Sequence, residues 1–494
     1  NANLLKSQIN TISDYLSRTY DYVQAVKSDG SGQLMSNSIY FDMENSTQVP
    51  VESKRVDVIP ITAENIYSAS QRNDIDNLIQ RGEKKYVNVF VERALAKVVV
   101  EKPEFKMDDY YVADDNNTKI KTITLFDHVN GTSRDIVVRP EIEGMVLNVL
   151  APKTALVKPL NIDEVGYDQN ATDYKAFQWN DPANKRSYWA STAFLDETSM
   201  KYLSWNQASE RGDSKFTQYI HPNTQDFKPI TANEGRSLNT KVMVSATLYE
   251  YKDGEKQEKP LDLVMFGADY LLADDFKAHV ANLINRDIRN IEWTNALINV
   301  ENVTLTDDQL TAINSCVNNA YTAENGYKAD DFKLDIAEYT PEDEFGIEDW
   351  IASVFTKDGV QKPQITGYPE VNGVDELNSY VQKVIDATKQ ATLDRINTNR
   401  IMYWKEGRTY FYTIIRHQGF NGLVGNGTSD FLYGVVRNHV YNITLTGVYG
   451  LGTPVINPKK PIHPQHPNDE RPSYIKAKIN ILPWRIVTNN ATIH

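Results

Sequence analysis

The sequence is poor in the features that define several protein classes. It has one cysteine, Cys316, so no internal disulfide can form and the fold must be stabilised by packing. No apolar run approaches the roughly 18 residues of a membrane-spanning helix, and we expect no such helix. The 24 glycines and 20 prolines are too few among 494 residues for a collagen-like or low-complexity chain. With 40% hydrophobic and 24% charged residues, the composition is that of a globular protein.

Positive charge is also scarce. The chain has 52 Lys and Arg against 66 Asp and Glu, a formal net charge of −14. Nucleic-acid binding needs a basic face that displaces counterions from phosphates, so we expect no nucleic-acid partner. The length predicts two or three domains. The chain opens on Asn1 without a basic and apolar leader, which predicts a processed or truncated form.

Signatures of catalysis and metal binding are missing from the sequence. It has no GxSxG elbow, no HExxH pair and no Walker loop. His463 and His466 are the closest histidines, and their proline-rich surroundings favour a solvated linker over a metal site. The acidic residues in 342–349 are interpreted as a solvated helix start. We therefore predict a protein that is not an enzyme and that has no cofactor and no metal.

Hydrophobic periodicity separates helical from extended segments. Apolar residues three or four apart predict helices at 4–26, 63–82, 275–293, 306–321 and 374–397. Alternating and β-branched residues predict strands at 86–100, 119–125, 135–138, 144–157, 241–251, 408–417, 433–448 and 473–487. The first of these is predicted as one long or bent strand. We expect a mainly β fold with helical insertions.

The polar, aperiodic segment 161–190 divides the chain. We expect an N-terminal β-sandwich domain over 1–160, incomplete at its start, and a C-terminal β-sandwich domain with helical insertions over 191–456. Five prolines in 457–472 predict an exposed, semi-stiff arm, because proline cannot donate to a ladder and holds its predecessor extended. Residues 473–494 follow this arm.

The last predicted strand has a complete apolar face. Alternate residues from Ile475 to Ile481 are apolar, and the residues between them are polar. Pro483 interrupts the pattern, which continues in the opposite parity at Trp484 and Ile486, as a bulge or kink requires. Burying four such side chains contributes roughly 6 to 12 kcal/mol. The strand either folds back onto its own domain or reaches a neighbouring subunit, which would build a polymer.

Five strings, spread over most of the chain, resemble the fimbrillins of Bacteroidales, which are the subunits of type V pili. They are YVNVFVERALAKVVV (86–100), EGMVLNVLAPKTALVKPL (143–160), KRSYWA (185–190), GVVRNHVYNITLTGVYGLGTPV (434–455) and IKAKINILPWRIV (475–487). The last two are the most specific. The similarity is strongest to the major stalk subunit of the shorter of the two fimbria types.

This resemblance implies two transthyretin-like β-sandwiches in tandem plus a C-terminal donor strand. It implies a structural subunit that is made as a lipoprotein, matured by an arginine-directed protease and assembled by donor-strand exchange. Loss of a first N-terminal strand would open a groove that another subunit's C-terminal strand fills. The fimbrium would be anchored at the outer membrane and support adhesion, biofilm formation and virulence.

The same resemblance implies partners and site residues. The partners are identical subunits, accessory anchor and tip fimbrial proteins, and receptors on host cells or bacterial surfaces. The donor strand would fall within 473–490, and its candidate pocket fillers are Ile475, Ala477, Ile479, Ile481, Trp484 and Ile486. The candidate groove residues are Val87, Val89, Val91 and Val98. One departure is the helical pattern at 4–26, where a family member first shows β-strands.

Other functions stay open. An accessory or tip fimbrial adhesin would share the sandwiches and need not donate a strand. A surface glycan-binding lipoprotein would use an aromatic surface built from the 28 tyrosines and the tryptophans. Arg211, Gly212 and Asp213, followed by Ser214, spell RGDS, a string that host integrins can recognise on an exposed loop.

Overall fold

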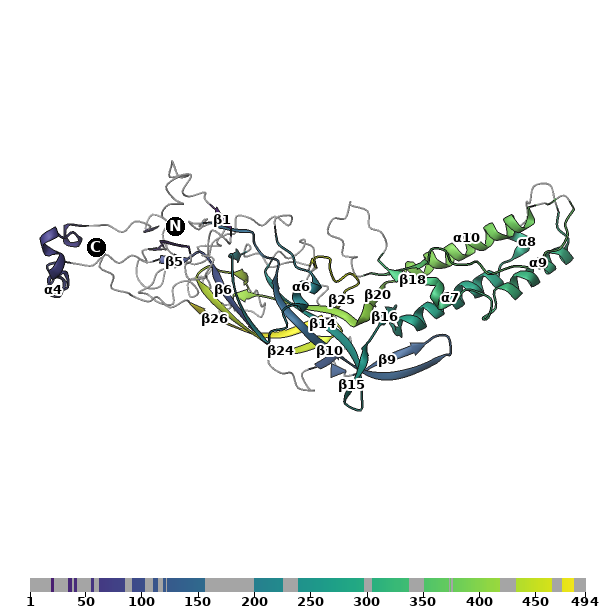
Figure 1. Cartoon of the computed structure of the whole chain (residues 1–494), viewed down its shortest axis with the longest axis horizontal. Helices are drawn as coiled ribbons and strands as arrows, with labels where there is room; N and C mark the ends of the chain where they lie inside the picture. The colour runs from purple at the N-terminus through teal and green to yellow at the C-terminus, as the bar shows by residue number, and fades with distance from the viewer. Residues whose placement is uncertain are drawn as a thin grey trace, which may run out of the picture.

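The strands gather in the middle of the molecule, and a helical extension leaves them at one end (Figure 1). The structure is a computed structural model. It describes residues 19–21, 34–37, 40–41, 55–56, 62–84, 91–102, 110–113, 119–120, 122–155, 200–224, 239–296, 304–336, 351–372, 374, 376–417, 432–463 and 473–483. The predicted class is confirmed, because the fold is mainly β with a few helices and open mixed sheets.

Two large sheets dominate the described residues. The nine-stranded sheet has the order β20 (Ile401–Trp404), β16 (Leu263–Phe266), β17 (Asp269–Leu272), β9 (Thr122–Asp127), β10 (Thr132–Asn148), β14 (Lys241–Lys252), β21 (Arg408–Ile414) and β25 (Thr453–Pro454), with β15 (Glu255–Pro260) also paired to β14. The six-stranded sheet has the order β12 (Lys215–Ile220), β6 (Ala96–Glu101), β24 (His439–Gly450), β7 (Tyr110–Ala113) and β8 (Lys119–Ile120), with β26 (Ser473–Pro483) also paired to β24.

One hydrophobic core joins these two sheets. Val98 of β6 and Ile443 of β24 contribute from the six-stranded sheet, and Leu147 of β10 and Val244 of β14 contribute from the nine-stranded sheet. None of the four is more than 1% exposed. Both faces of β14 are buried over its first two thirds, which explains its nearly continuous apolar sequence. The sheets therefore form a sandwich, with β10 and β14 at its centre.

A β-bulge in β10 brings that strand against helix α6 (Trp205–Ser209). The register between β10 and β14 shifts between Ile142 and Gly144. A Cβ atom on Gly144 would lie 2.0 Å from the carbonyl oxygen of Ala208 and 2.7 Å from that of Arg211. Glycine is therefore required at this position, because any side chain would push α6 away from the sheet.

The helical extension is built on amphipathic helices. Its main helices are α7 (Ala273–Arg289), α9 (Asp307–Ala320) and α10 (Leu377–Asn397), with α8 (Trp293–Ala296), η5 (Ala329–Asp331) and a two-stranded sheet of β18 (Phe332–Asp335) and β19 (Ser353–Thr356). Phe276, Val280 and Ile284 recur every four residues on α7 and are fully buried in the core of the extension. The helices predicted at 275–293, 306–321 and 374–397 are confirmed (Figure 1).

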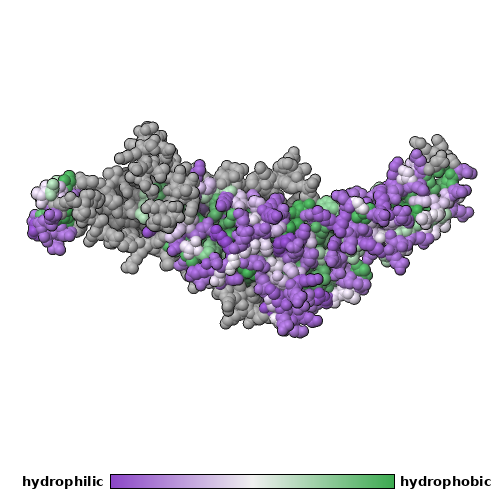
Figure 2. All heavy atoms as spheres, viewed as in Figure 1, coloured by the Kyte–Doolittle hydropathy of each residue, from purple (hydrophilic) through white to green (hydrophobic). Residues whose placement is uncertain are grey.

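The face of this extension that Figure 2 shows is largely hydrophilic. Helices α7 and α10 are joined by Asp287, whose Oδ2 lies 2.6 Å from Arg395 Nη2 and accepts a hydrogen bond of 3.0 Å from Thr392 Oγ1. Burial opposes ionisation of Asp287, but the hydrogen bonds from Arg286, Arg395 and Thr392 outweigh it and lower the pKa of the carboxyl. Asp287 therefore stays ionised and holds the two helices together.

The remaining strands are short. A three-stranded sheet contains β13 (Asn223–Thr224), β23 (Leu432–Val435) and β22 (Arg416–His417), and two-stranded sheets pair β2 (Met35–Asn37) with β5 (Val91–Arg93), β3 (Tyr40–Phe41) with β4 (Arg55–Val56), and β1 (Thr19–Asp21) with β11 (Lys153–Ala155). The predicted helix at 4–26 is therefore wrong at 19–21. Tyr20 lies opposite Thr154, and aromatic and β-branched residues favour such pairing. The rest of that predicted helix lies outside the described residues.

Two further expectations are refined near the start of the chain. The helical segment predicted at 63–82 is present as η2 (Ala63–Asn65), η3 (Ala69–Asp74) and α4 (Ile75–Gln80), and its first two pieces are 3₁₀ turns. The strand predicted at 86–100 is bent between β5 and β6, where Ala94 and Leu95 are fully buried. Residues 86–90 lie outside the described part.

The expected connection at 161–190 lies outside the described residues. Strands from both sides of it share the same sheets, because β10 pairs with β14 from Val137 to Asn148 and β6 pairs with β24. The expected boundaries at 160 and 191 are therefore not boundaries between sheets. The tandem arrangement of two transthyretin-like sandwiches stays a prediction.

Candidate functional site

The C-terminal strand predicted at 473–487 is present as β26, and it pairs with β24 of the same chain (Figure 1). The ladder is antiparallel and runs from Ser473 opposite Gly450 to Pro483 opposite His439. Four of the predicted pocket fillers lie in it: Ile475, Ala477, Ile479 and Ile481 are opposite Val448, Leu445, Ile443 and Tyr441. Trp484 and Ile486 lie outside the described residues.

The position of β26 at the edge of its sheet decides what this strand can do. The other edge of β24 is occupied by β6 over Val440–Thr444 and by β7 at Val448 and Tyr449, both parallel to it. β24 is therefore an interior strand. Among the described strands, β24 is the only one that pairs with β26. Removing β26 would expose one edge of β24 and leave its pairing with β6 and β7 in place.

The acceptor strand β24 begins at a turn that is held by buried polar groups. The hydroxyl of Tyr441 accepts a hydrogen bond of 2.8 Å from the backbone N–H of Val436. Burial raises the pKa of this hydroxyl, which stays protonated. The ring Nδ1 of His439 lies 2.8 Å from the carbonyl oxygen of Arg437. The turn at 436–439 is thus fixed from inside the core.

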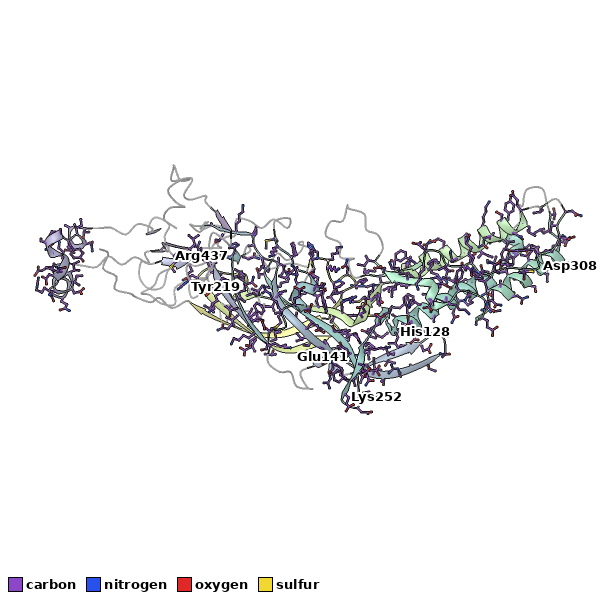
Figure 3. The ribbon with its side chains drawn as sticks, in the orientation of Figure 1. His128, Glu141, Tyr219, Lys252, Asp308 and Arg437 are labelled. Carbon is purple, nitrogen blue, oxygen red and sulfur yellow. The ribbon has the colours of Figure 1, made fainter. Side chains whose placement is uncertain are left out.

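Arg437, which is labelled in Figure 3, forms an ion pair at this turn. Its Nε lies 3.2 Å from Oε1 of Glu92, and the two side chains are only 3% and 1% exposed. Arg437 also donates to the backbone carbonyl of Ala155 at 3.2 Å. Burial lowers the pKa of Arg437, and the charge of Glu92 opposes this effect. No motif in the sequence indicates this pair, because its members are far apart in the chain.

Asn438 completes the same junction. Its φ is +60°, in the left-handed region that asparagine tolerates better than most residues. Its N–H donates to the carbonyl oxygen of Leu95 at 3.0 Å, and its Oδ1 accepts from the N–H of Arg93 at 3.1 Å. The bend between β5 and β6 is thereby attached to the start of β24. This attachment sets the parallel register in which Lys97 lies opposite Val440.

The chain between β25 and β26 is anchored before it reaches the terminal strand. The N–H of Ile462 donates to Leu203 at 2.9 Å, and its carbonyl oxygen accepts from Asn148 Nδ2 at 2.9 Å. Ile462 is 9% exposed, and Pro461 forms a β-bridge with Ser204. The expectation of an exposed arm holds at Asn457, Lys459, Lys460 and Pro461, which are exposed, and is wrong at Ile462, which is buried and bound through its backbone. Residues 464–472 lie outside the described part.

The predicted groove residues are not brought together among the described residues. Val98 is fully buried in β6, which has β12 on one edge and β24 on the other. Val91 lies in β5, opposite Asn37 of β2. Val87 and Val89 lie outside the described residues. An acceptor groove at these positions stays a prediction.

The RGDS string lies between helix α6 and strand β12. All four residues, 211–214, are exposed. The carbonyl oxygen of Arg211 accepts from the N–H of Met145 at 3.4 Å, and its Nη1 lies 3.4 Å from Gln218 Oε1. The loop is thus attached to the bulged part of β10 through its backbone. Its recognition by a receptor stays a prediction.

The described residues add little support for the other expectations. His463 packs against Tyr202, with ring centroids 4.0 Å apart, and His466 lies outside the described part. No group of three His, Cys, Asp or Glu that could hold a metal occurs where the structure is described.

Every Tyr and Trp side chain described is buried or half-buried. No helix in the described ranges is both long and apolar enough to cross a membrane.

Comparison with known proteins assigns a class to the part of the chain that contains β24 and β26. Residues 402–490 match the family model described as major fimbrial subunit protein type IV, fimbrillin, C-terminal. No curated protein matches the chain in a sequence search. The match supports a fimbrillin-type major fimbrial subunit. Fimbrillins are structural proteins of a cell-surface appendage and not enzymes.

Proposed function

We propose that this protein is the major stalk subunit of a surface fimbria and that it polymerises with identical subunits by exchange of its C-terminal strand. The observation that carries this proposal is the edge position of β26 within the segment that matches the fimbrillin model. Main-chain pairing supplies affinity in strand addition, and alternate side chains supply register. In the filament, the same terminal strand pairs with a neighbouring subunit.

The energetics permit exchange of this strand between subunits. Leaving β24 breaks one ladder, and pairing with an equivalent edge in a neighbour restores the same kind of hydrogen bonds, so the net cost is small. The anchor at Ile462 keeps the root of the strand on its own subunit. From His463 to Ser473 the extended chain spans at most roughly 35 Å, which limits how far the strand can reach from its anchor.

A reversible covalent lock tests this proposal. Asn442 of β24 lies directly opposite Asn480 of β26, and directly opposed residues in an antiparallel pair have Cα separations compatible with a disulfide. We would make Asn442→Cys with Asn480→Cys in a Cys316→Ser background. The oxidised monomer should fail to polymerise, and reduction should restore filaments to the level of the background protein.

The control lock leaves the terminal strand free. Thr217 of β12 lies opposite Val99 of β6, so Thr217→Cys with Val99→Cys locks a different pair in the same sheet. This variant should polymerise in both redox states. Filaments of normal length from the oxidised Asn442–Asn480 variant would overturn strand exchange. If the background protein itself formed no filaments, the subunit assignment would fail instead.

The side-chain part of the proposal has its own test. Alternation places Ile479 and Asn480 on opposite faces of an extended strand. Ile479→Asp should block assembly, because it introduces a charge where the neighbour's core would be, whereas Asn480→Asp should assemble normally. Fimbria yield from cells that express each variant measures the difference. Equal yields from both would contradict a role for the apolar face.

The cellular setting follows from the same proposal. We infer that the subunit is made as a lipoprotein precursor, is matured by proteolysis and is displayed at the outer membrane with accessory anchor and tip proteins. Adhesion and biofilm formation would depend on the assembled fimbria. An accessory or tip adhesin is the main alternative, and the copy number of the protein along isolated fimbriae separates the two, because a stalk subunit is present throughout.

A second role, adhesion through the RGDS loop, is favoured by the exposure of residues 211–214. We propose that the loop is available to integrin-type receptors on the surface of the subunit. Asp213→Glu keeps the charge but moves the carboxylate, and it should reduce attachment of fimbriated cells to host cells. Glu210→Asp makes the reverse change just before the RGDS string and should leave attachment unchanged. Equal attachment by both variants would remove this role.

A further inference from the structure

Two histidine rings lie close together, tilted to one another, where the tip of the β9–β10 hairpin meets helix α7. His128 belongs to the hairpin turn and His279 belongs to the helix. Their ring centroids are 4.8 Å apart, with an interplanar angle of 37°. Figure 3 labels His128 close to the first part of α7. This contact joins the nine-stranded sheet to the helical extension.

The turn holds His128 in a fixed place. Oδ1 of Asp127 accepts from the N–H groups of Val129 and Asn130, at 2.9 and 3.0 Å, and Oδ2 accepts from Asn130 Nδ2 at 2.6 Å. Gly131 has a φ of +64°, which closes the turn. His128 is therefore presented to α7 by a preorganised loop.

One phenylalanine ring packs against each imidazole. Phe126 of β9 stacks on His128 with a centroid distance of 6.0 Å, and Phe266 of β16 meets the ring of His279 edge-on at 6.5 Å. His279 is half-buried. The contact is thus partly shielded from water, so solvent only weakly screens a second positive charge placed in it.

The charged groups around the pair are unevenly placed. Asp269 of β17 lies 3.1 Å from His128 Nε2, so a protonated His128 has a counter-charge. His279 has Arg286 on its own helix and His128 across the contact. Asp275 lies on α7 as well. The groups that act on Asp275 are Asp127 of the turn, Asp274 of α7 and Arg134 of β10.

These surroundings move the pKa values of His279 and Asp275 in opposite directions. Burial lowers the pKa of His279 below its ordinary value of 6.5, and the charges of His128 and Arg286 lower it further. Burial raises the pKa of Asp275 above its ordinary value of 3.8, and the charges of Asp127 and Asp274 add to this. The neutral form of His279 is therefore the one that the closed contact favours.

We propose that the contact of His128 with His279 is an acid-sensitive joint that is closed at neutral pH and opens when His279 is protonated. Two imidazolium rings repel each other, and Asp269 pairs with only one of them. Separation of the hairpin tip from α7 relieves the repulsion. Because α7 also packs against β16 and β17, opening frees the hairpin tip and leaves the helix attached to the sheet.

The sign of the pH dependence follows from the two shifts. His279 binds a proton more readily when the joint is open than when it is closed. Closure is therefore favoured above pH 6.5 and weakens as the pH falls below that value. The effect of Asp275 on closure has the opposite sign, because its carboxyl binds a proton more readily when the joint is closed. The ordinary pKa of this carboxyl is 3.8, so Asp275 favours closure only at a pH lower than the range in which His279 acts. Opening is therefore greatest in mildly acidic solution.

Nuclear magnetic resonance of the full chain with ¹³C-labelled histidine tests the joint. At pH 7.5 the ring protons of His128 and His279 should show a mutual nuclear Overhauser effect. Between pH 7.5 and pH 5 this signal should fall at least fivefold as His279 titrates with a midpoint below 6.5. A signal that persists after His279 has titrated would overturn the proposal, as would a midpoint for His279 above 6.5.

A variant at His279 distinguishes the effect of protonation from the effect of ring packing. His279→Phe keeps an aromatic ring in the contact but cannot be protonated. In this variant the signal between His128 and the new ring should be present at pH 7.5 and unchanged at pH 5. Loss of the signal at pH 5 in His279→Phe would show that another group opens the joint and would contradict the role of His279.

Discussion

Arg437 Nε lies 3.2 Å from Glu92 Oε1 inside the protein, and this ion pair connects two segments that the sequence keeps far apart. Glu92 lies in β5 and Arg437 lies in the turn before β24. Both ions have lost their hydration, and each compensates the charge of the other. The start of the strand that receives β26 is thus held by the N-terminal part of the chain.

The two single replacements at this pair should be costly and the double replacement much less so. Arg437→Met or Glu92→Leu leaves one buried charge uncompensated and should lower the free energy of unfolding by about 3 to 5 kcal/mol. The double variant removes both charges and should recover most of that loss. Urea denaturation of the four proteins measures the coupling. Single variants as stable as the parent would contradict the buried pair.

Gly144 should tolerate no side chain. In Gly144→Ala the new Cβ would meet the carbonyl oxygen of Ala208 at 2.0 Å, and the backbone must move to relieve the clash. We expect a loss of about 2 to 4 kcal/mol in the free energy of unfolding. Gly131→Ala is the matched control, because open space surrounds that position and only its φ of +64° is strained. It should lose about 1 kcal/mol, and thermal unfolding ranks the two.

Asp287 should make the helical extension sensitive to strong acid. Its pKa is lowered in the folded protein, so its contribution is complete above its ordinary value of 3.8 and is lost as the pH falls through the folded pKa. Asp287→Asn should cost about 1 to 2 kcal/mol at neutral pH and flatten the acid limb of the stability curve. Asp274→Asn, at a side chain that is 85% exposed, should change neither. Denaturation between pH 7 and pH 3 is the measurement.

Asn148 should control the anchor of the terminal strand. Asn148→Ala leaves the carbonyl oxygen of Ile462 and the N–H of Leu203 without their side-chain partner, at a cost of about 2 to 4 kcal/mol. Limited proteolysis near 457–463 should accelerate in this variant. Asn206→Ala keeps its backbone hydrogen bond to Pro458 and should be cut at the parent rate. Equal rates for both variants would show that Asn148 does not hold the anchor.

Local pattern predicted many of the elements that the structure describes. The strand at 241–251 and the helices at 275–293, 306–321 and 374–397 follow from period-2 alternation or from apolar residues three and four apart, which act within one element. The helical period over 4–26 predicts helix at 19–21, where the structure has a strand. Pairing with β11 overrides that local preference.

The anchored arm shows the same division between local pattern and tertiary contact. Prolines in 457–472 predict an extended chain, and local rules carry no information about what binds it. The contact of Ile462 with Asn148 joins residues from two distant segments, so only folding brings them together.

Composition and alternation along the chain determine that it is globular, mainly β, without a disulfide, and that its last strand has one apolar face, because these properties depend on residues close in sequence. The tertiary structure decides that this strand pairs with β24, that Glu92 meets Arg437 and that His128 meets His279. Each of these contacts joins segments distant in sequence, and such contacts depend on how the sheets and helices pack.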